Sequence, residues 1–485
     1  MSGQTLARYS IAAGGLFVVA VVASSPQTVL VGGIPTTYQT TGVSGVPLSF
    51  LLVMAVIAVL AVGYLAVGGH VRHGAPFYAQ LVRGMNPTVG LAGGAVAFVG
   101  YNALQISLYP LFGVTVSGLS GRGTWWTWAL LAWLIVFVLG RYPGAINARF
   151  LGVLLALELA VILLFIAAGF THPATGEIST AVFRPSNLLV AGAAASVVVF
   201  AVAAFAGLES VLAYAEEAKS YRGLVWAAGT AIGVCGLLYV LASWAYGTWL
   251  GLDRLQTADQ EANSPLALLG SVYGAGIADL ATLLLVTSVL AAQSSFHATV
   301  ARYVFALARE QVLPTSWGTV SRGAKGGAPR GGGVVQSVTA LLVLAGFVAI
   351  GADPMSVMFP WLSTIGAFCI LLLLTAANWS AINFFERGLG GAESVLVRRV
   401  LPYLGGVLGV LAVVFMASSL SDLLGTPPGS AKPWLVAVPI GAFVLGAFVV
   451  GGWLRHACPE IYERLGHGVP DPARVLDDDL ADIEV

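Results

Sequence analysis

The chain has 485 residues, of which 58% are hydrophobic and only 9% are charged, and its formal net charge is zero. A soluble domain of this composition would expose too much apolar surface, so the sequence indicates a polytopic membrane protein embedded in a lipid bilayer. No basic domain points to a nucleic-acid partner. No cluster of His, Asp or Cys has catalytic or metal-ligand spacing, so we expect no catalytic residue, no metal and no cofactor.

Twelve apolar runs are long enough to cross a hydrocarbon core, which is roughly 30 Å thick and takes about 20 helical residues. The first run follows a polar decapeptide and has no small-residue cleavage site, so we interpret it as a retained helix. The sequence therefore predicts an all-α protein with twelve transmembrane helices. They lie at approximately 11–34, 47–70, 86–118, 124–140, 147–170, 187–216, 223–250, 275–308, 333–351, 356–382, 399–419 and 433–454.

Basic side chains are concentrated on one side of these spans. An even number of spans puts both termini on the same side, which then holds 18 of the 22 Lys and Arg residues, whereas the other side holds four. Loops rich in Lys and Arg stay in the cytoplasm, so we expect both termini to be cytoplasmic. The excess of Arg over Lys favours a bacterial source and hence the bacterial cytoplasmic membrane. No outer segment has a cysteine, so no disulfide-linked ancillary subunit is expected.

Two spans are interrupted near the middle of the membrane. In the first, Pro26 follows two serines, and a proline lacks the N–H and clashes with the carbonyl four residues before it. In the sixth, residues 205–209 bring a glycine and a carboxylate to the same depth. Paired broken helices in corresponding positions of two halves point to an inverted-repeat transporter with its substrate at the unwound backbone. A break at Gly32 and Gly33 is an alternative, and it would lie near the outer surface.

Glu209 and Glu158 are two carboxyls expected inside the membrane. An ionisable side chain near the bilayer centre costs roughly 2.5–3.5 kcal/mol on insertion scales, so it indicates a cavity, a partner or a proton path. Burial disfavours the charged form of a carboxyl, and we expect both groups to take up and release protons during transport. The alternative is a structural role, with Glu209 bonded to backbone amides and Glu158 paired with a hydroxyl such as that of Ser294 or Ser295.

The third span carries a polar cluster of Tyr101, Asn102 and Gln105, because positions 101 and 105 share a helical face and 102 adjoins it. Such groups often form hydrogen bonds between helices, and contact with a substrate is the alternative. His297 of the eighth span could relay protons, although packing is the commoner role of a lone histidine.

Two stretches resemble a known transporter family. The run FAGLESVLAYAEEAKSYR, which ends at Arg222, is similar to the sixth helix of the amino acid, polyamine and organocation (APC) transporters, and SSFHATVARYVFALAREQVLP from Ser294 to Pro314 is similar to their eighth helix. The resemblance implies the LeuT-type fold, with five-helix inverted repeats at about 11–170 and 187–382 and two extra helices at about 399–454. We thus expect one transporter domain over 1–455 and a cytoplasmic acidic tail over 456–485.

The resemblance also implies a substrate site between the two breaks. The substrate carboxylate would lie on amides of 24–28 and its amine on carbonyls of 200–205, with Phe205 closing over it because Ala203 stands where some members have an aromatic gate. Glu158 falls near the position of a family lysine, and Ser294 and Ser295 would be remnants of an ion site. The predicted substrate-binding residues are Ala23, Ser24, Ser25, Pro26, Gln27, Thr28, Tyr101, Asn102, Phe200, Ala203, Phe205, Ala206, Gly207 and Thr364.

No span carries a basic residue in its interior, and Arg302 lies at the inner end of the eighth span, so the predicted cavity favours amines over anionic substrates. We therefore expect a secondary active transporter, or permease, that moves amino acids or related amines by alternating access and is coupled to protons through Glu209 and Glu158. A polyamine importer or an amine and amino acid exchanger is the alternative.

Overall fold

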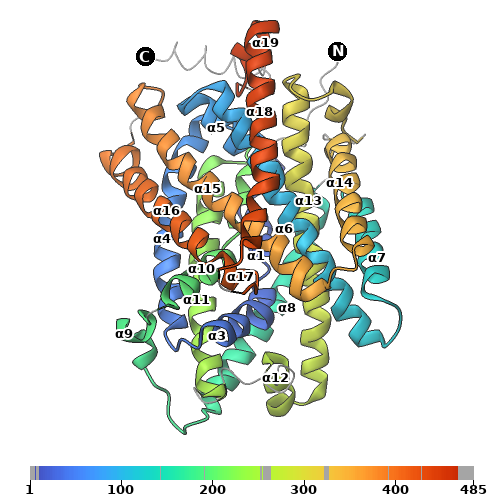
Figure 1. Cartoon of the computed structure of the whole chain (residues 1–485), viewed down its shortest axis with the longest axis vertical. Helices are drawn as coiled ribbons and strands as arrows, with labels where there is room; N and C mark the ends of the chain where they lie inside the picture. Colours follow the sequence, from blue (N-terminus) through green and yellow to red (C-terminus); the bar gives the residue numbers. More distant parts are fainter. Residues whose placement is uncertain are drawn as a thin grey trace.

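The computed structural model describes residues 6, 10–142, 144–190, 192–251, 254, 264–321, 327–391, 393–427 and 429–467, with the backbone alone for 144–150. Most of the predicted acidic tail, 468–485, lies outside the described residues. The described part is built of helices (Figure 1), and its two β-bridges are isolated contacts. It is therefore an all-α structure.

Eleven segments of the described chain are helical, long and apolar enough to cross a membrane, which fits a polytopic membrane protein. The predicted fourth span is α7 (Trp125–Leu139), a helix of 15 residues and about 22 Å, so it is too short to meet the same criterion. The eleven are Ala13–Thr41, Val46–His70, Pro87–Ser120, Leu151–Thr171, Ala194–Tyr214, Tyr221–Leu250, Ala275–Arg309, Arg330–Ala349, Pro354–Glu386, Leu396–Ser418 and Lys432–Ala457.

The two interrupted spans and the helices that bond to them occupy the first two thirds of the chain. They are α1 (Ala13–Ser24), α2 (Pro26–Thr28), η1 (Val29–Gly33), α3 (Ile34–Thr41), α4 (Val46–His70), α5 (Pro76–Gly84), α6 (Pro87–Ser120), α8 (Gly144–Thr171), α10 (Ala194–Ala204), η3 (Leu208–Tyr214), α11 (Tyr221–Leu250) and α13 (Ala275–Arg309). The remaining principal helices are α9 (Pro185–Leu188), α12 (Pro265–Tyr273), α14 (Arg330–Ala349), α15 (Phe359–Glu386), α16 (Leu401–Ser418), α17 (Leu420–Leu423), α18 (Ala437–Ala457) and α19 (Pro459–Arg464).

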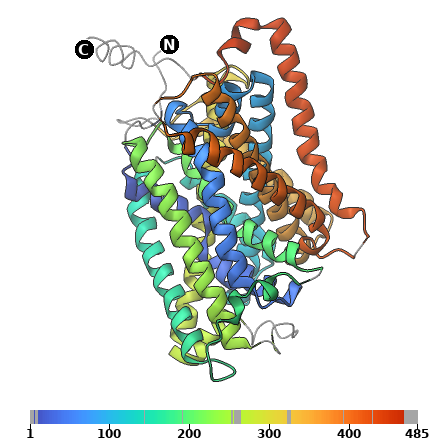
Figure 2. The same ribbon diagram turned by 90° about the vertical axis from the view of Figure 1, so that its left-hand side faces the viewer.

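Helix α6 lies at the centre of the bundle. It packs against α13, α15, α18, α5 and α7, whereas α18 stands at one edge (Figure 2). Helices α5 and α19 lie at one end of the molecule and α3, α9 and α12 at the other (Figure 1). These are called the α5 end and the α3 end below.

The first span is interrupted at Ser25, within the segment that the sequence predicts. Helix α1 ends at Ser24, Ser25 adopts a left-handed conformation with φ 48°, and Pro26 opens α2. A non-glycine residue rarely adopts positive φ, and it does so here because the following proline cannot continue the hydrogen-bond ladder. Gly32 and Gly33 continue the helix as part of η1, so the interruption does not lie at the alternative register.

The sixth span is interrupted at residues 205–207. Helix α10 ends at Ala204, Gly207 has φ 108°, and the chain continues as the 3₁₀ helix η3. A Cβ atom on Gly207 would lie 2.9 Å from the carbonyl oxygen of Ala23 and 2.9 Å from Cζ of Phe296. Glycine is thus needed twice, for its backbone conformation and for this close approach. The two interruptions therefore meet in the interior of the bundle.

Candidate functional site

Glu158 of α8 holds the first interruption. Its side chain is buried, and its Oε1 accepts the backbone N–H of Gln27 at 3.0 Å and the hydroxyl of Ser288 at 2.8 Å. The N–H groups in the first turn of a helix have no partner within that helix, so the carboxylate takes the place of an N-cap for the segment that restarts at Pro26.

Hydroxyl groups continue this contact across the interruption. The Ser288 and Ser25 Oγ atoms are 3.0 Å apart, and the Ser25 Oγ lies 2.7 Å from Thr28 Oγ1. Gln27 donates its side-chain amide to the carbonyl of Ala281 at 2.6 Å, which leaves its Oε1 without a partner in the described structure. Glu158 is therefore the centre of a polar group drawn from Ser25 at the interruption and from α2, α8 and α13.

The hydroxyl partner of Glu158 on α13 is Ser288, which corrects the expectation that Ser294 or Ser295 fills this place. Ser288 precedes Ser294 by six residues, or about 9 Å along the helix. Ser288 is the partner because α13 crosses the level of the first interruption nearer to its N-terminus than the sequence suggests. Ser294 donates to the carbonyl of Leu290 in its own helix, and the buried Ser295 Oγ has no partner in the described structure.

Glu209 lies at the second interruption. Its Oε2 accepts the N–H of Gly207 at 2.9 Å, so this carboxylate also binds a backbone amide released by a break. Its Oε1, like the hydroxyls of Tyr64 and Tyr101, is buried and makes no hydrogen bond of ordinary geometry in the described structure. Tyr64, Tyr101 and Tyr303 lie close enough to the carboxylate to interact with it electrostatically.

Aromatic rings enclose this carboxylate. Tyr101 packs against Phe296 and Tyr303 with ring centroids 6.3 and 5.7 Å apart, and Tyr64 stacks on Phe77 at 4.3 Å. A carboxylate among aromatic faces suits a cationic group, because both the charge and the ring quadrupole attract it. Tyr101 is among the substrate-binding residues predicted from the sequence, whereas Tyr64 carries no local signal.

Ser24 joins the two interruptions directly. Its Oγ lies 2.6 Å from the hydroxyl of Tyr239 and donates to the carbonyl of Ala204 at 3.4 Å. Tyr239 of α11 also packs edge-on against Phe205, with ring centroids 5.5 Å apart. Phe205 is buried. The sequence does not single out Tyr239, because Ser24, whose hydroxyl it meets, lies 215 positions earlier in the chain.

The described structure has two cavities beside these interruptions. A cavity of about 30 Å³ is lined by Tyr64, Phe205, Ala206 and Glu209 with apolar residues of α11 and α15. A second, of about 80 Å³, is lined by Val22, Ser294, Ser295 and Arg302 and extends toward the α5 end. Pockets for small molecules usually measure roughly 300–1,000 Å³, so both are too small to hold an amino acid in this conformation.

The other predicted site residues lie at varying distances from these cavities. Phe200 and Ala203 are half-buried on α10, and Thr364 is buried in α15, one turn before the cavity-lining Ala367. Asn102 donates to the carbonyl of Phe98 in its own helix. Neither cavity is lined by the described residues 23–28.

Gln105 belongs to a separate polar chain. Its amide donates to Tyr109 at 2.8 Å, and its carbonyl accepts the amide of Gln336 at 2.9 Å. Gln336 Oε1 in turn lies 2.5 Å from Nδ1 of His297. The chain links α6, α14 and α13, so His297 and Gln105 have satisfied hydrogen-bonding partners between helices. The cluster predicted within the third span is thus divided between two neighbourhoods.

An ion pair connects the end of the sixth span with α13. Arg302 Nε donates to Glu217 Oε1 at 2.6 Å, with both side chains buried, and the guanidinium lies 3.7 Å from the centre of the Tyr214 ring. Removal of either partner would leave the other charge buried and unpaired, which strongly destabilises a protein. The pair therefore fixes this part of the α5 end.

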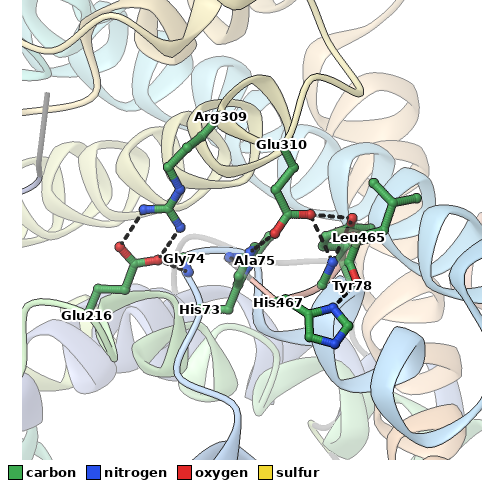
Figure 3. Close-up of polar contacts among 10 residues, drawn as sticks. His73, Gly74, Ala75, Tyr78, Glu216, Arg309, Glu310, Leu465 and His467 are labelled. Carbon is green, nitrogen blue, oxygen red and sulfur yellow. Dashed lines mark hydrogen bonds and ion pairs between the residues drawn. The ribbon is translucent and has the colours of Figure 1, made fainter. Parts of the chain in front are cut away.

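A second ion pair joins the same two segments (Figure 3), between Glu216, the residue before Glu217, and Arg309, seven residues after Arg302. Arg309 donates to both oxygens of Glu216, at 3.0 and 2.7 Å, and the Gly74 N–H donates to Oε1 at 2.9 Å. Burial acts to raise the pKa of Glu216, but Arg309 and these hydrogen bonds hold that pKa below its usual range. The pair is therefore charged at neutral pH.

The next residue, Glu310, collects three further hydrogen bonds (Figure 3). Its carboxylate accepts from His73 Nε2 at 2.9 Å, from the Tyr78 hydroxyl at 2.6 Å and from the Gly466 N–H at 2.9 Å. Burial acts to raise the pKa of Glu310, but His73 and these hydrogen bonds lower it to about 2. These partners come from residues 73–78 and from Gly466, which are more than 150 positions away in the chain, so no local pattern reveals them.

The arrangement is suited to binding and conformational change. Within the part of the chain that the structure describes, no group of three or more His, Cys, Asp or Glu side chains could hold a metal ion. What the interior offers is two interrupted helices, each bonded to one carboxylate, and an aromatic enclosure around one of these carboxylates.

Comparison with known families gives one match. The family model for amino acid permeases aligns with residues 16–458, which include both interruptions, both carboxylates and the helices around them. No individual curated protein matches the chain significantly.

Proposed function

The chain belongs to the amino acid permease family of the APC superfamily, and from this premise we propose that it is a proton-coupled secondary transporter. Members of this family are transporters, and the membrane-spanning helices agree with amino acid transport. The proposed substrate is an amino acid or a related amine, carried across the cytoplasmic membrane by alternating access.

The observation that carries the proposal is that each interruption is bonded to one carboxylate. Glu158 accepts the Gln27 N–H and Glu209 accepts the Gly207 N–H. A hydrogen bond to an ionised acceptor is roughly twice as strong as a neutral one. Protonation would therefore weaken the hold on both helix restarts and ease the movement of the half-helices. This supports proton coupling through the two groups that the sequence analysis selected.

The substrate is proposed to lie between the two interruptions. Its ammonium group would approach the Glu209 carboxylate among Tyr64 and Tyr101, where the negative charge and the ring faces both attract a cation. Its carboxylate, if it has one, would bind amides near 24–28. Because the present cavities are small, binding requires the helices around the interruptions to separate.

The α5 end is proposed to face the cytoplasm. The basic residues of the chain favour this orientation. The pairs Arg302–Glu217 and Arg309–Glu216 would then close the cytoplasmic side, and opening toward the cell interior requires at least their rearrangement. The helices of the two halves are proposed to form inverted five-helix repeats.

Thermal stabilisation of the purified protein by a panel of amino acids and diamines tests the substrate class. A ligand that binds only the folded state should stabilise it by roughly 2.7 kcal/mol at a hundredfold excess over its dissociation constant. We expect an α-amino acid to raise the melting temperature, and Phe205→Ala to abolish the shift. A shift with putrescine-like diamines alone would replace the amino acid by a polyamine, and no shift with either class would contradict the proposed substrates.

A further inference from the structure

The last described segment of the chain, residues 459–467, packs onto the α5 end. After α18 the chain turns into the short helix α19, where the Tyr462 hydroxyl lies 2.9 Å from Thr88 Oγ1 at the start of α6. Leu465 is completely buried. The Gly466 N–H donates to Glu310 at 2.9 Å and approaches the Tyr78 hydroxyl at 3.2 Å. The segment therefore has apolar and polar anchors at separate points.

Position 466 has a backbone conformation and a close contact with α5 that only glycine meets without strain. Its φ is 73°, and a Cβ atom there would lie 2.7 Å from Cβ of Val82 in α5. Both the left-handed conformation and the close approach favour glycine. The backbone of the segment thus lies directly on α5 and is held by hydrogen bonds at the same residue.

Glu310 makes this contact part of the closure of the α5 end. The same carboxylate binds His73 after α4, Tyr78 of α5 and Gly466 of the terminal segment. Nδ1 of His73 accepts the Ala75 N–H at 3.0 Å, so Nε2 carries the proton donated to Glu310. The preceding residue, Arg309, holds Glu216. One end of α13 is therefore tied to the segments after α4 and η3, to α5 and to the end of the chain.

We propose that residues 459–467 are an autoinhibitory latch, which holds α13 against α5 and slows opening of the transporter at the α5 end. The inference rests on the proposed transport function, because only a protein that opens at this end is slowed by the latch. Opening requires α13 to move relative to α4, α5 and η3, and the segment adds contacts to both α5 and Glu310 that must be broken first. Releasing it leaves the ion pair of Arg309 with Glu216 in place but lowers the resistance to opening.

The test compares two shortened chains in which Cys458 is changed to serine and Ser294 to cysteine. One ends at His467 and keeps the latch, and the other ends at residue 458 and lacks it. Ser294 lines the cavity that extends toward the α5 end, and the two other native cysteines, Cys235 and Cys369, are buried. The rate at which a water-soluble maleimide labels Cys at position 294 then measures opening without any knowledge of the substrate.

We expect the chain without the latch to be labelled at least about fivefold faster, the lower limit of a typical coupling between sites, and to transport faster. Equal labelling rates in the two chains, each monodisperse and folded, would overturn the latch. Faster labelling without transport of any amino acid or polyamine by either chain would instead contradict the proposed function and leave the latch supported.

A substitution in the full-length chain gives a second readout. Gly466→Ala adds a Cβ atom that would lie 2.7 Å from Cβ of Val82, so it should displace the segment from α5. In the full-length chain with Cys458→Ser and Ser294→Cys, Gly466→Ala should therefore speed labelling at position 294. If the chains with and without Gly466→Ala are labelled at the same rate, the latch is overturned.

Discussion

At the scale of single residues, the contact between Gly207 and Ala23 decides how closely the two interruptions approach. The backbone conformation of Gly207 is left-handed, and the space beside it is taken by the Ala23 carbonyl and by Phe296. Backbone in such a conformation is tolerated where the surrounding structure imposes it, and it is common at functional sites. Here it lets Glu209 bond to the amide of the break itself.

Gly207→Ala should therefore destabilise the protein by about 1–3 kcal/mol and abolish transport, because the interruptions are forced apart. The melting temperature in detergent and the initial rate of uptake measure the two effects. Gly233→Ala is the matched control, since a Cβ atom there meets nothing within 4 Å and the residue lies inside α11. A Gly207→Ala protein as stable and active as the control would show that the close contact is not needed.

Some residues of the site can be predicted from the sequence and others cannot. A carboxylate within an apolar span is a strong local signal, because the bilayer penalises it, and Glu158 and Glu209 were selected on that ground. Ser288 and Tyr239 carry no such signal. Their significance comes from contacts with Glu158 and Ser24, which are 130 and 215 residues away in the chain.

At the scale of elements, α13 is the helix to which both interrupted spans are joined. It contacts α1, α2 and η3, and its buried Arg302 bonds to Glu217 just beyond η3. The helices themselves were predictable from apolar runs, and the first interruption from its proline. The depth at which α13 meets the first interruption was not, because sequence gives the length of a helix but not how far it is shifted along its neighbours.

Glu217→Leu should lower the free energy of unfolding by about 3–5 kcal/mol, because it leaves a buried arginine without its partner. The double variant with Arg302→Leu should recover most of this loss, since replacing both charges removes the unpaired group. Denaturant titrations in detergent measure all three proteins. The pair Arg399–Glu386, whose side chains are 66% and 52% exposed, supplies the control: Glu386→Leu should cost less than about 1 kcal/mol. Equal losses at the two sites would contradict a special role for the buried pair.

At the scale of the whole molecule, buried ion pairs and hydrogen bonds gather at the α5 end. The α5 end carries the buried pairs of Arg302 and Arg309 and the hydrogen bonds around Glu310. Composition and hydropathy were sufficient to predict a polytopic helical bundle. They could not predict this closure, because its charged groups lie at helix ends that the sequence presents as ordinary hydrophilic loops.

The proposed transport cycle follows from these three scales together. Two carboxylates bond to two interrupted helices, the interruptions meet at a glycine, and at the α5 end an ion pair joins α13 to the segment after η3. Protonation of the carboxylates is the proposed step that connects the proton gradient with movement of the half-helices, and it is the central claim.

Uptake by proteoliposomes under an imposed proton gradient tests this claim most directly. The radiolabelled amino acid that gives the largest thermal stabilisation is supplied outside, and initial rates are compared with the gradient present and collapsed. Wild-type protein should accumulate the amino acid only with the gradient. Glu158→Gln and Glu209→Gln should show no gradient-driven accumulation, because an amide cannot take up and release the proton. Wild-type accumulation that persists when the gradient is collapsed would contradict proton coupling, as would gradient-driven accumulation by both glutamine variants.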